Sequence, residues 1–81
     1  MPRPRTVTGG PLAEMTHAEV AAVATATGRA LSTVETWRRG NRRAPAIESD
    51  RVAETLHAGD PVRWPEPVAL ARRIREDGPR R

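Results

Sequence analysis

The sequence predicts an all-α domain of four helices. Four segments place apolar residues three and four positions apart, the period of a helix with one buried face. Each segment begins and ends at residues that favour helix starts and stops. No run of alternating apolar and polar residues is long enough to predict a strand. With 81 residues the chain is one small domain with a modest core, so a ligand or a second copy would add stability.

Composition shifts set the expected boundaries. Residues 1–11 hold three prolines and a Gly-Gly pair, which favours a flexible basic arm. We expect a folded domain over 12–77 and a tail over 78–81. The helices are expected at about 16–27, 31–40, 47–58 and 65–77, and the last one follows a proline-rich link.

The first expected helix has a clear start and stop. Thr16 and Glu19 have the spacing of a capping box, in which each side chain accepts a hydrogen bond from the other residue's backbone N–H. Gly28 ends the helix because glycine tolerates the left-handed conformation of a C-terminal turn. The residues expected to face inward are Val20, Val23, Ala24 and Thr27.

The second expected helix carries one of the two tryptophans. Ser32 and Glu35 offer another capping box, and Gly40-Asn41 closes the segment. Its expected buried stripe is Leu31, Val34 and Trp37.

The last two helices are bounded by prolines. Pro45 separates the third helix from the second, and Pro67 is tolerated in the first turn of the fourth, where its missing N–H has no helical partner. Glu48 and Asp50 suit the positive end of the third helix dipole. The expected apolar faces are Ile47, Val52, Ala53 and Leu56 in the third helix, and Val68, Leu70, Ala71 and Ile74 in the fourth.

The relation between the first two helices predicts a helix-turn-helix. A small residue, a glycine and two apolar anchors stand at Ala24, Gly28, Val34 and Trp37, where they allow close crossing, a sharp turn and docking of the second helix. The side chains then expected to point outward into a major groove are Ser32, Thr33, Glu35, Thr36 and Arg39. Hydroxyls can bond bases or phosphates, a glutamate can accept from cytosine, and an arginine can fork onto guanine.

Positive charge gathers on the same segment. The chain has a net charge of +4 and all fourteen basic residues are arginine, although GC-rich coding explains the lack of lysine equally well. Residues 29–43 contain five arginines and one acidic residue, Glu35. Their local charge of +4 equals the net charge of the whole chain. The residues expected to contact the DNA backbone are Arg29, Arg38, Asn41, Arg42 and Arg43. In the arm, Arg3 and Arg5 are candidates for a minor groove.

From Thr16 to Leu56, about half the chain, the sequence resembles the helix-turn-helix of phage Cro and lysogeny-repressor (XRE-like) regulators. The matching residues are Trp37, Gly40, Arg42, Pro45, Val52, Ala53 and Leu56. The resemblance implies a dimeric, sequence-specific regulator, most often a repressor, on double-stranded DNA in a bacterial or phage-infected cell. It also implies that Leu31, with Ser32, Thr33, Glu35 and Thr36, faces bases.

The chain departs from that family at three places. The family has a full helix before the capping box, whereas only residues 11–15 are available here, and the helix from Pro65 is a candidate to take its place. Arg29 occupies a turn position that is usually apolar, and Pro45 lies one residue late. These departures bear on the loop contacts and the mode of dimerisation.

A second resemblance is to excisionases and mercury-resistance type regulators, through residues 18–21 and 33–40. That resemblance implies an architectural DNA-binding factor with a β-hairpin wing after the glycine. Residues 42–47 are too short, and the residues after them too helical, for a good wing, so this interpretation ranks second.

Other function classes find less support. Without cysteine, tyrosine or a glycine-rich phosphate loop, and with His17 and His57 forty residues apart, we expect no enzyme, cofactor, metal site or small-molecule substrate. No segment approaches the roughly 20 apolar residues of a membrane span, and nothing argues for an oxidising compartment. The alternative of another class is a protein-interaction or dimerisation module, with Trp64, Val68, Leu70 and Ile74 as either core or interface.

Overall fold

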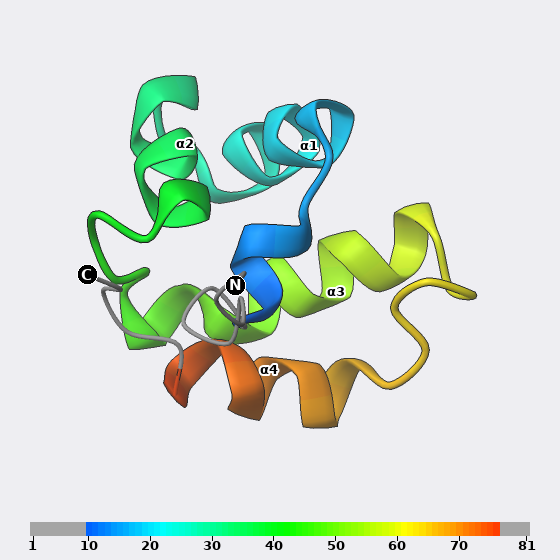
Figure 1. The fold of residues 1–81 in the computed structure, drawn as a ribbon. Helices are drawn as coiled ribbons and strands as arrows, with labels where there is room; N and C mark the ends of the chain where they lie inside the picture. Colours follow the sequence, from blue (N-terminus) through cyan, green and yellow to red (C-terminus); the bar gives the residue numbers. More distant parts are fainter. Residues whose placement is uncertain (1–9, 77–81) are drawn as a thin grey trace, which may run out of the picture.

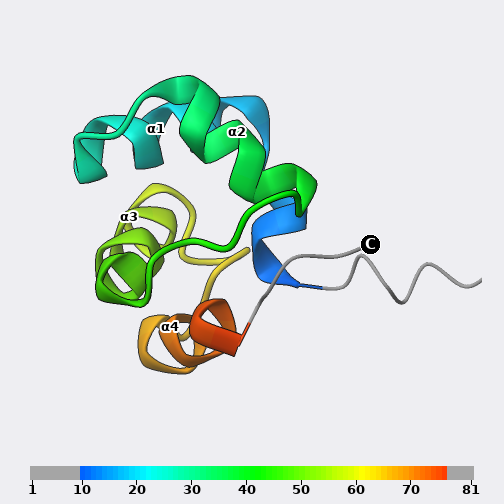
Figure 2. The same ribbon diagram turned by 90° about the vertical axis from the view of Figure 1, so that its left-hand side faces the viewer.

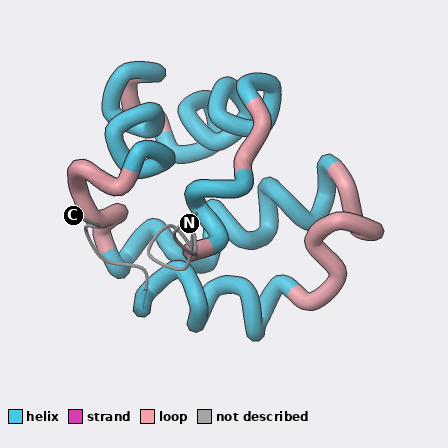
Figure 3. The backbone as a smooth tube through the Cα atoms, in the orientation of Figure 1, coloured by secondary structure: helices cyan, strands magenta, loops and turns pink. Residues whose placement is uncertain are grey.

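The computed structural model describes residues 10–76, and every regular element in that range is helical (Figures 1 and 3). The four α-helices are α1 (His17–Thr27), α2 (Leu31–Arg39), α3 (Ser49–Gly59) and α4 (Pro67–Glu76). Two short 3₁₀ turns, η2 (Pro11–Glu14) and η3 (Ala46–Glu48), precede α1 and α3. The all-α, four-helix prediction is therefore confirmed.

The helices are stacked around α3. This helix packs against α1 on one side and α4 on the other, while α2 packs against α1 (Figures 1 and 2). The turn η2 lies between α2 and α4 and contacts both. None of the helices in residues 10–76 combines the length and the hydropathy that crossing a bilayer requires.

The ends of α1 and α2 follow the expected glycines and, at one of two places, the expected cap. The Thr16 hydroxyl accepts from the Glu19 N–H at 3.1 Å, and the Glu19 carboxylate accepts from the Thr16 N–H at 2.8 Å, which confirms the first capping box. The second capping box is wrong: α2 begins at Leu31 with Ala30 as its N-cap and no side-chain cap. Ser32 is the second residue of the helix, two positions after the N-cap, so it cannot cap it.

The core agrees with most of the expected inward residues and corrects three. The buried apolar side chains are Leu12, Met15, Val20, Val23, Ala24, Val34, Trp37, Ala44, Val52, Ala53, Leu56, Trp64, Leu70, Ala71 and Ile74. The predictions that Leu31, Ile47 and Val68 are buried are wrong: Leu31 is 45% exposed, Ile47 87% and Val68 85%.

 Ile47 and Val68 are exposed for different reasons. Ile47 belongs to η3 rather than to α3, and Val68 stands two residues before Leu70, which places it on the outer side of a helix with 3.6 residues per turn.

The 3₁₀ turn η2 lies directly before the capping box of α1. In η2, Pro11 is buried, Leu12 is 1% exposed and Met15, just after the turn, is 4% exposed. These side chains cover the space between α2 and α4, so the C-terminal helix does not fill it alone. Pro11, expected in the arm, belongs to the folded part. Arg3, Arg5 and the 78–81 tail lie outside the described residues.

The connection between α3 and α4, residues 60–66, is fixed to α1 by a cluster of polar contacts. The Arg63 guanidinium donates to both carboxylate oxygens of Glu19 at 2.6 Å and to the backbone carbonyl of Glu14. Trp64 is buried, and its indole N–H donates to Glu19 at 2.9 Å. The His57 Nδ1 donates to the Trp64 carbonyl at 2.6 Å, so this nitrogen carries the proton.

The same cluster changes the ionisation of Glu19. Burial by itself would raise the pKa of this carboxyl, but hydrogen bonds from Arg63, Trp64 and the Thr16 backbone outweigh it and lower the pKa below its ordinary value. Glu19 therefore stays ionised over a wide pH range, and it holds the start of α1 and the α3–α4 connection together.

Candidate nucleic-acid interface

The α1–α2 hairpin has the scaffold that the spacing predicts. Val34 and Trp37 are 0% and 1% exposed and anchor α2, while Ala24 is 8% exposed where the two helices meet. Gly28 has φ +71° and ends α1 in the left-handed conformation. The Arg29 N–H then donates to the Ala24 carbonyl at 3.1 Å, which closes the turn.

Gly40 repeats this arrangement at the other end of α2. Its φ is +83°, and the Asn41 N–H donates to the Thr36 carbonyl at 3.1 Å. A left-handed glycine thus precedes and follows α2, and each one turns the chain sharply. These two turns set where α2 begins and ends relative to its neighbours.

The outer side of α2 carries five of the six expected base-contacting residues, all except Glu35. Ser32 and Arg39 are exposed, and Thr33 and Thr36 are half-buried. The Thr36 hydroxyl donates to the Ser32 carbonyl at 2.8 Å, so its hydrogen is used within the helix while its oxygen can still accept. Leu31 is exposed at the first position of the helix.

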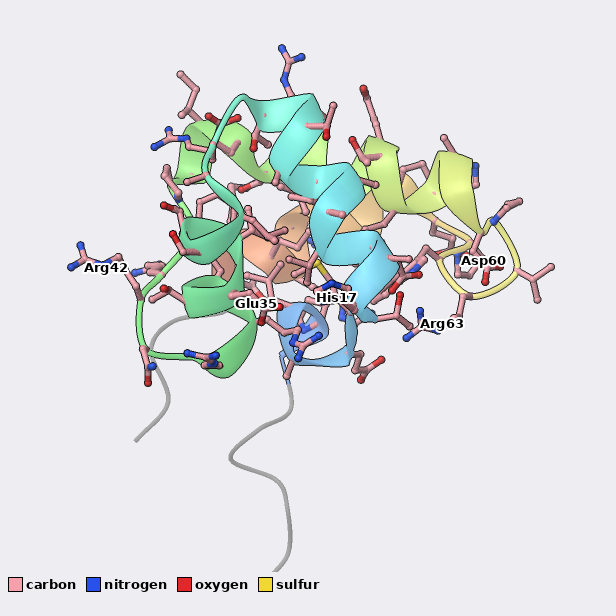
Figure 4. All side chains as sticks on the ribbon, turned by 90° about the horizontal axis from the view of Figure 1, so that it is seen from above. His17, Glu35, Arg42, Asp60 and Arg63 are labelled. Carbon is pink, nitrogen blue, oxygen red and sulfur yellow. The ribbon has the colours of Figure 1, made fainter. Side chains whose placement is uncertain are left out.

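Glu35 does not point outward with these residues. Its side chain is only 17% exposed, and its carboxylate lies 3.6 Å from His17 Nδ1 and 3.5 Å from Arg38 Nε. Figure 4 shows Glu35 and His17 beside each other between α2 and the start of α1. Its Oε1 is buried and makes no hydrogen bond to a described residue. The expectation of Glu35 on the outer face is therefore wrong: the side chain joins the two helices.

Three of the arginines expected on the DNA backbone are engaged within the protein. Arg29 donates twice to Glu48 Oε2, at 3.3 and 3.0 Å. Arg38 donates to the Met15 carbonyl at 3.4 Å besides pairing with Glu35. Arg43 donates to the Arg75 carbonyl at 2.7 Å, near the C-terminal end of α4, where the helix dipole favours a cation.

Arg39, Asn41 and Arg42 are different. All three are exposed, and their side chains make no hydrogen bond or ion pair to the rest of residues 10–76. Figure 4 shows Arg42 extending away from the body of the molecule. They occupy the last position of α2 and the chain directly after it, so unpaired donors gather at one end of this helix.

This end of α2 belongs to a larger basic side of the molecule. Figure 2 looks onto it: α2, the segment after Gly40, the first residues of α3 and the end of α4 all face the viewer. Arg39, Arg42 and Arg43 belong to these elements, as does Arg75, which pairs with the exposed Asp50 at 3.5 Å. A polyanion approaching this side would meet several guanidinium groups at once.

Other side chains singled out for chemistry have structural surroundings. His17 is 77% exposed beside Glu35, and His57 serves the α3–α4 connection. Ser49 is fully buried at the first turn of α3, with no hydrogen bond from its hydroxyl to a described residue. Residues 10–76 contain no group of three or more potential ligands arranged to hold a metal ion.

Comparison of the chain with protein-family models, with curated proteins and with solved structures finds no match in any of the three.

Proposed function

We propose that the protein is a sequence-specific regulator that binds double-stranded DNA with α2 in the major groove. The observation that carries this proposal is the set of exposed, unengaged donors Arg39, Asn41 and Arg42 at the end of a helix bounded by two left-handed glycines. Arg29, Arg38 and Arg43 make hydrogen bonds within the protein. Arg39, Asn41 and Arg42 make none within residues 10–76, so their donors are available to a ligand.

The dimensions and chemistry of α2 suit this role. An α-helix with side chains is about 10–12 Å across, close to the roughly 12 Å width of the major groove. Arg39 can donate in a fork to guanine, and the Ser32, Thr33 and Thr36 oxygens can bond base edges or phosphates. Arg42 and Asn41 follow Gly40, where the chain would leave the groove beside a phosphate.

The intramolecular contacts reduce the expected set of DNA contacts. Arg29, Arg38 and Glu35 hold η3, η2 and α1 in place, so the proposal assigns them to positioning α2. Arg43 keeps donors available beyond its bond to the Arg75 carbonyl and remains a secondary phosphate contact. Base readout is assigned to Leu31, Ser32, Thr33, Thr36 and Arg39.

The resemblance adds a dimer on a two-fold symmetric operator, repression, and action in the cytoplasm of a bacterial or phage-infected cell. The excisionase-like alternative also binds DNA, but it needs a β-hairpin wing after α2. Residues 41–48 contain no strand and end in η3. We therefore prefer the regulator to the architectural factor as the proposed function.

The test begins with a random duplex pool, from which the wild-type protein selects its preferred sequence. Specific binding should exceed binding to a scrambled duplex by about a thousand-fold or more at near-physiological salt. Arg39→Ala should cost about 1 to 3 kcal/mol on the selected duplex and relax the preference at one base pair. Arg42→Ala should weaken both duplexes alike and reduce the salt slope by about one.

The matched control is Arg72→Ala, which removes an exposed arginine of α4 and should leave both affinities unchanged. Equal losses from Arg39→Ala on every sequence would remove the base-readout role of α2. Binding that is weak, equal on both duplexes and abolished by salt would leave only charge attraction.

A protein-interaction module is the candidate of another class, and one exposed side chain favours it. Trp64, Leu70 and Ile74 belong to the core, whereas Val68 is 85% exposed on α4. Val68→Asp, which the fold should tolerate, would then abolish self-association in sedimentation experiments. DNA binding that survives this change while Arg39→Ala removes it would favour the regulator.

A further inference from the structure

Two exposed aliphatic side chains flank the Arg29–Glu48 ion pair. Leu31, two residues after Arg29, is 45% exposed, and Ile47, next to Glu48, is 87% exposed. Because Arg29 donates twice to Glu48, the pair ties η3 to the turn that precedes α2. The contact brings together two segments that are far apart in the sequence.

Ile47 is held on a fixed support. Ala44 and Ser49, on either side of it, are 3% and 0% exposed, and Glu48 is bound by Arg29. The Glu48 N–H also donates to the Pro45 carbonyl at 2.9 Å within the 3₁₀ turn. An isoleucine in a loose loop would be unremarkable, but here buried neighbours present an apolar side chain to solvent.

The surroundings indicate what covers these side chains. The segment that joins α2 to α3, which includes η3 and so Ile47, faces the viewer in Figure 2 together with α2 and the start of α3. Exposed arginines 42, 43 and 51 occur in these elements, and Arg29 lies in the turn before α2. A second copy placed here would bring its own guanidinium groups against them. A polyanion that also offers an apolar group fits better.

We infer that Ile47, together with Leu31, contacts thymine 5-methyl groups in the major groove. This inference rests on the proposed DNA binding. The thymine methyl is the apolar group that base pairs present in that groove, and an aliphatic side chain has no hydrogen-bonding alternative there. Ile47 thus adds a specificity-determining residue from outside the recognition helix.

The experiment uses the duplex that the wild-type protein selects from a random pool. Each thymine is replaced singly by deoxyuridine, which removes only the methyl group and keeps the hydrogen-bonding edge. At one or two positions the wild-type affinity should fall about three- to tenfold, the size expected for exposing one buried methyl group. Ile47→Ala should bind the thymine duplex more weakly by a similar factor and lose its sensitivity at one of those positions.

Val62→Ala is the matched control, because Val62 is 89% exposed in the α3–α4 connection and should change neither affinity nor methyl sensitivity. Thermal unfolding of Ile47→Ala should match the wild type, since its side chain is exposed. Full retention of methyl sensitivity in Ile47→Ala overturns the inference. So does a shift from dimer to monomer with methyl sensitivity unchanged, because a second copy would then cover Ile47. Failure of the wild-type protein to select any duplex would instead remove the proposed function, and the inference with it.

Discussion

The two connections that flank α3 both contain exposed arginine, yet they use it in opposite ways. In residues 60–66, Arg63 reaches Glu19 and Glu14, and its guanidinium carbon lies 4.9 Å from the centre of the Trp64 ring. In residues 40–45, Arg42 extends from the surface with no partner among the described residues (Figure 4). One connection is fixed to the body, and the other contains an arginine with no partner in residues 10–76.

The difference shows that charge density alone does not identify a binding surface. Of the five arginines between residues 29 and 43, three make hydrogen bonds within residues 10–76 and two, Arg39 and Arg42, make none there. A guanidinium held by a carboxylate or a carbonyl costs more to recruit, because the existing contact must be replaced. Unpaired arginines are therefore the better candidates for binding, and paired ones for stability.

The largest expected effect comes from the anchor of the fixed connection. Trp64→Ala should lower the free energy of unfolding by about 3 to 5 kcal/mol, because it empties a buried site and removes the indole donor. Chemical denaturation measures this change. Trp64→Phe, which keeps an aromatic ring but not the N–H, should lose less. Equal losses from both variants would mean that the bond to Glu19 dominates.

The charge of Glu19 should make stability depend on acid. Its pKa is lowered in the folded protein, so its contribution is complete above the unfolded value of about 4.3 and is lost as pH falls through the lower folded value. Glu19→Gln should cost about 1 to 2 kcal/mol at pH 7 and flatten this acid dependence. Unfolding curves at pH 7 and below pH 4 compare the two proteins. An unchanged acid dependence in Glu19→Gln would assign it to other carboxylates.

A left-handed glycine gives an intermediate effect that separates geometry from contacts. At Gly28 no atom lies within 4 Å of the position that a Cβ would occupy, so Gly28→Ala should cost only the backbone strain of φ +71°. That cost is about 1 kcal/mol. Thermal unfolding provides the measurement, and a much larger loss would indicate that the α1–α2 turn must rearrange.

The smallest expected effect is at the free arginine. Arg42→Ala should change the unfolding free energy by less than about 0.5 kcal/mol, because its side chain has no partner in residues 10–76. Arg63→Ala serves as the paired comparison and should cost about 1 kcal/mol, since its side chain is 37% exposed and partly screened. Similar losses from the two variants would contradict the contrast between the connections.

Local signals in the sequence predicted the fold well. Thr16 and Glu19 stand three residues apart, so their capping box is visible in the sequence, and Gly28 and Gly40 end helices where expected. The inward positions of Val34 and Trp37 follow from helical periodicity. Local patterns failed at Ile47, because it belongs to η3 and not to α3, and at Val68, because it stands two residues before the buried Leu70 and so faces outward.

The contacts that decide which arginines are available could not be predicted in the same way. Arg63 meets Glu19 across 44 residues, and Arg43 meets the Arg75 carbonyl across 32. Neither pair has a spacing that helical periodicity detects, because the partners meet only when the chain folds. Glu35 was misplaced for a related reason: its neighbour His17 becomes visible only once α1 and α2 are packed together.

The α2 helix lies between two left-handed glycines, and its exposed residues should tolerate substitution. Of its nine residues only Val34 and Trp37 are buried, and the turn on each side of it contains a glycine with positive φ. Variation at Ser32, Thr33, Thr36 and Arg39 should therefore leave folding intact. A library randomised at those four positions would be a practical starting point for engineering small proteins with new ligand preferences.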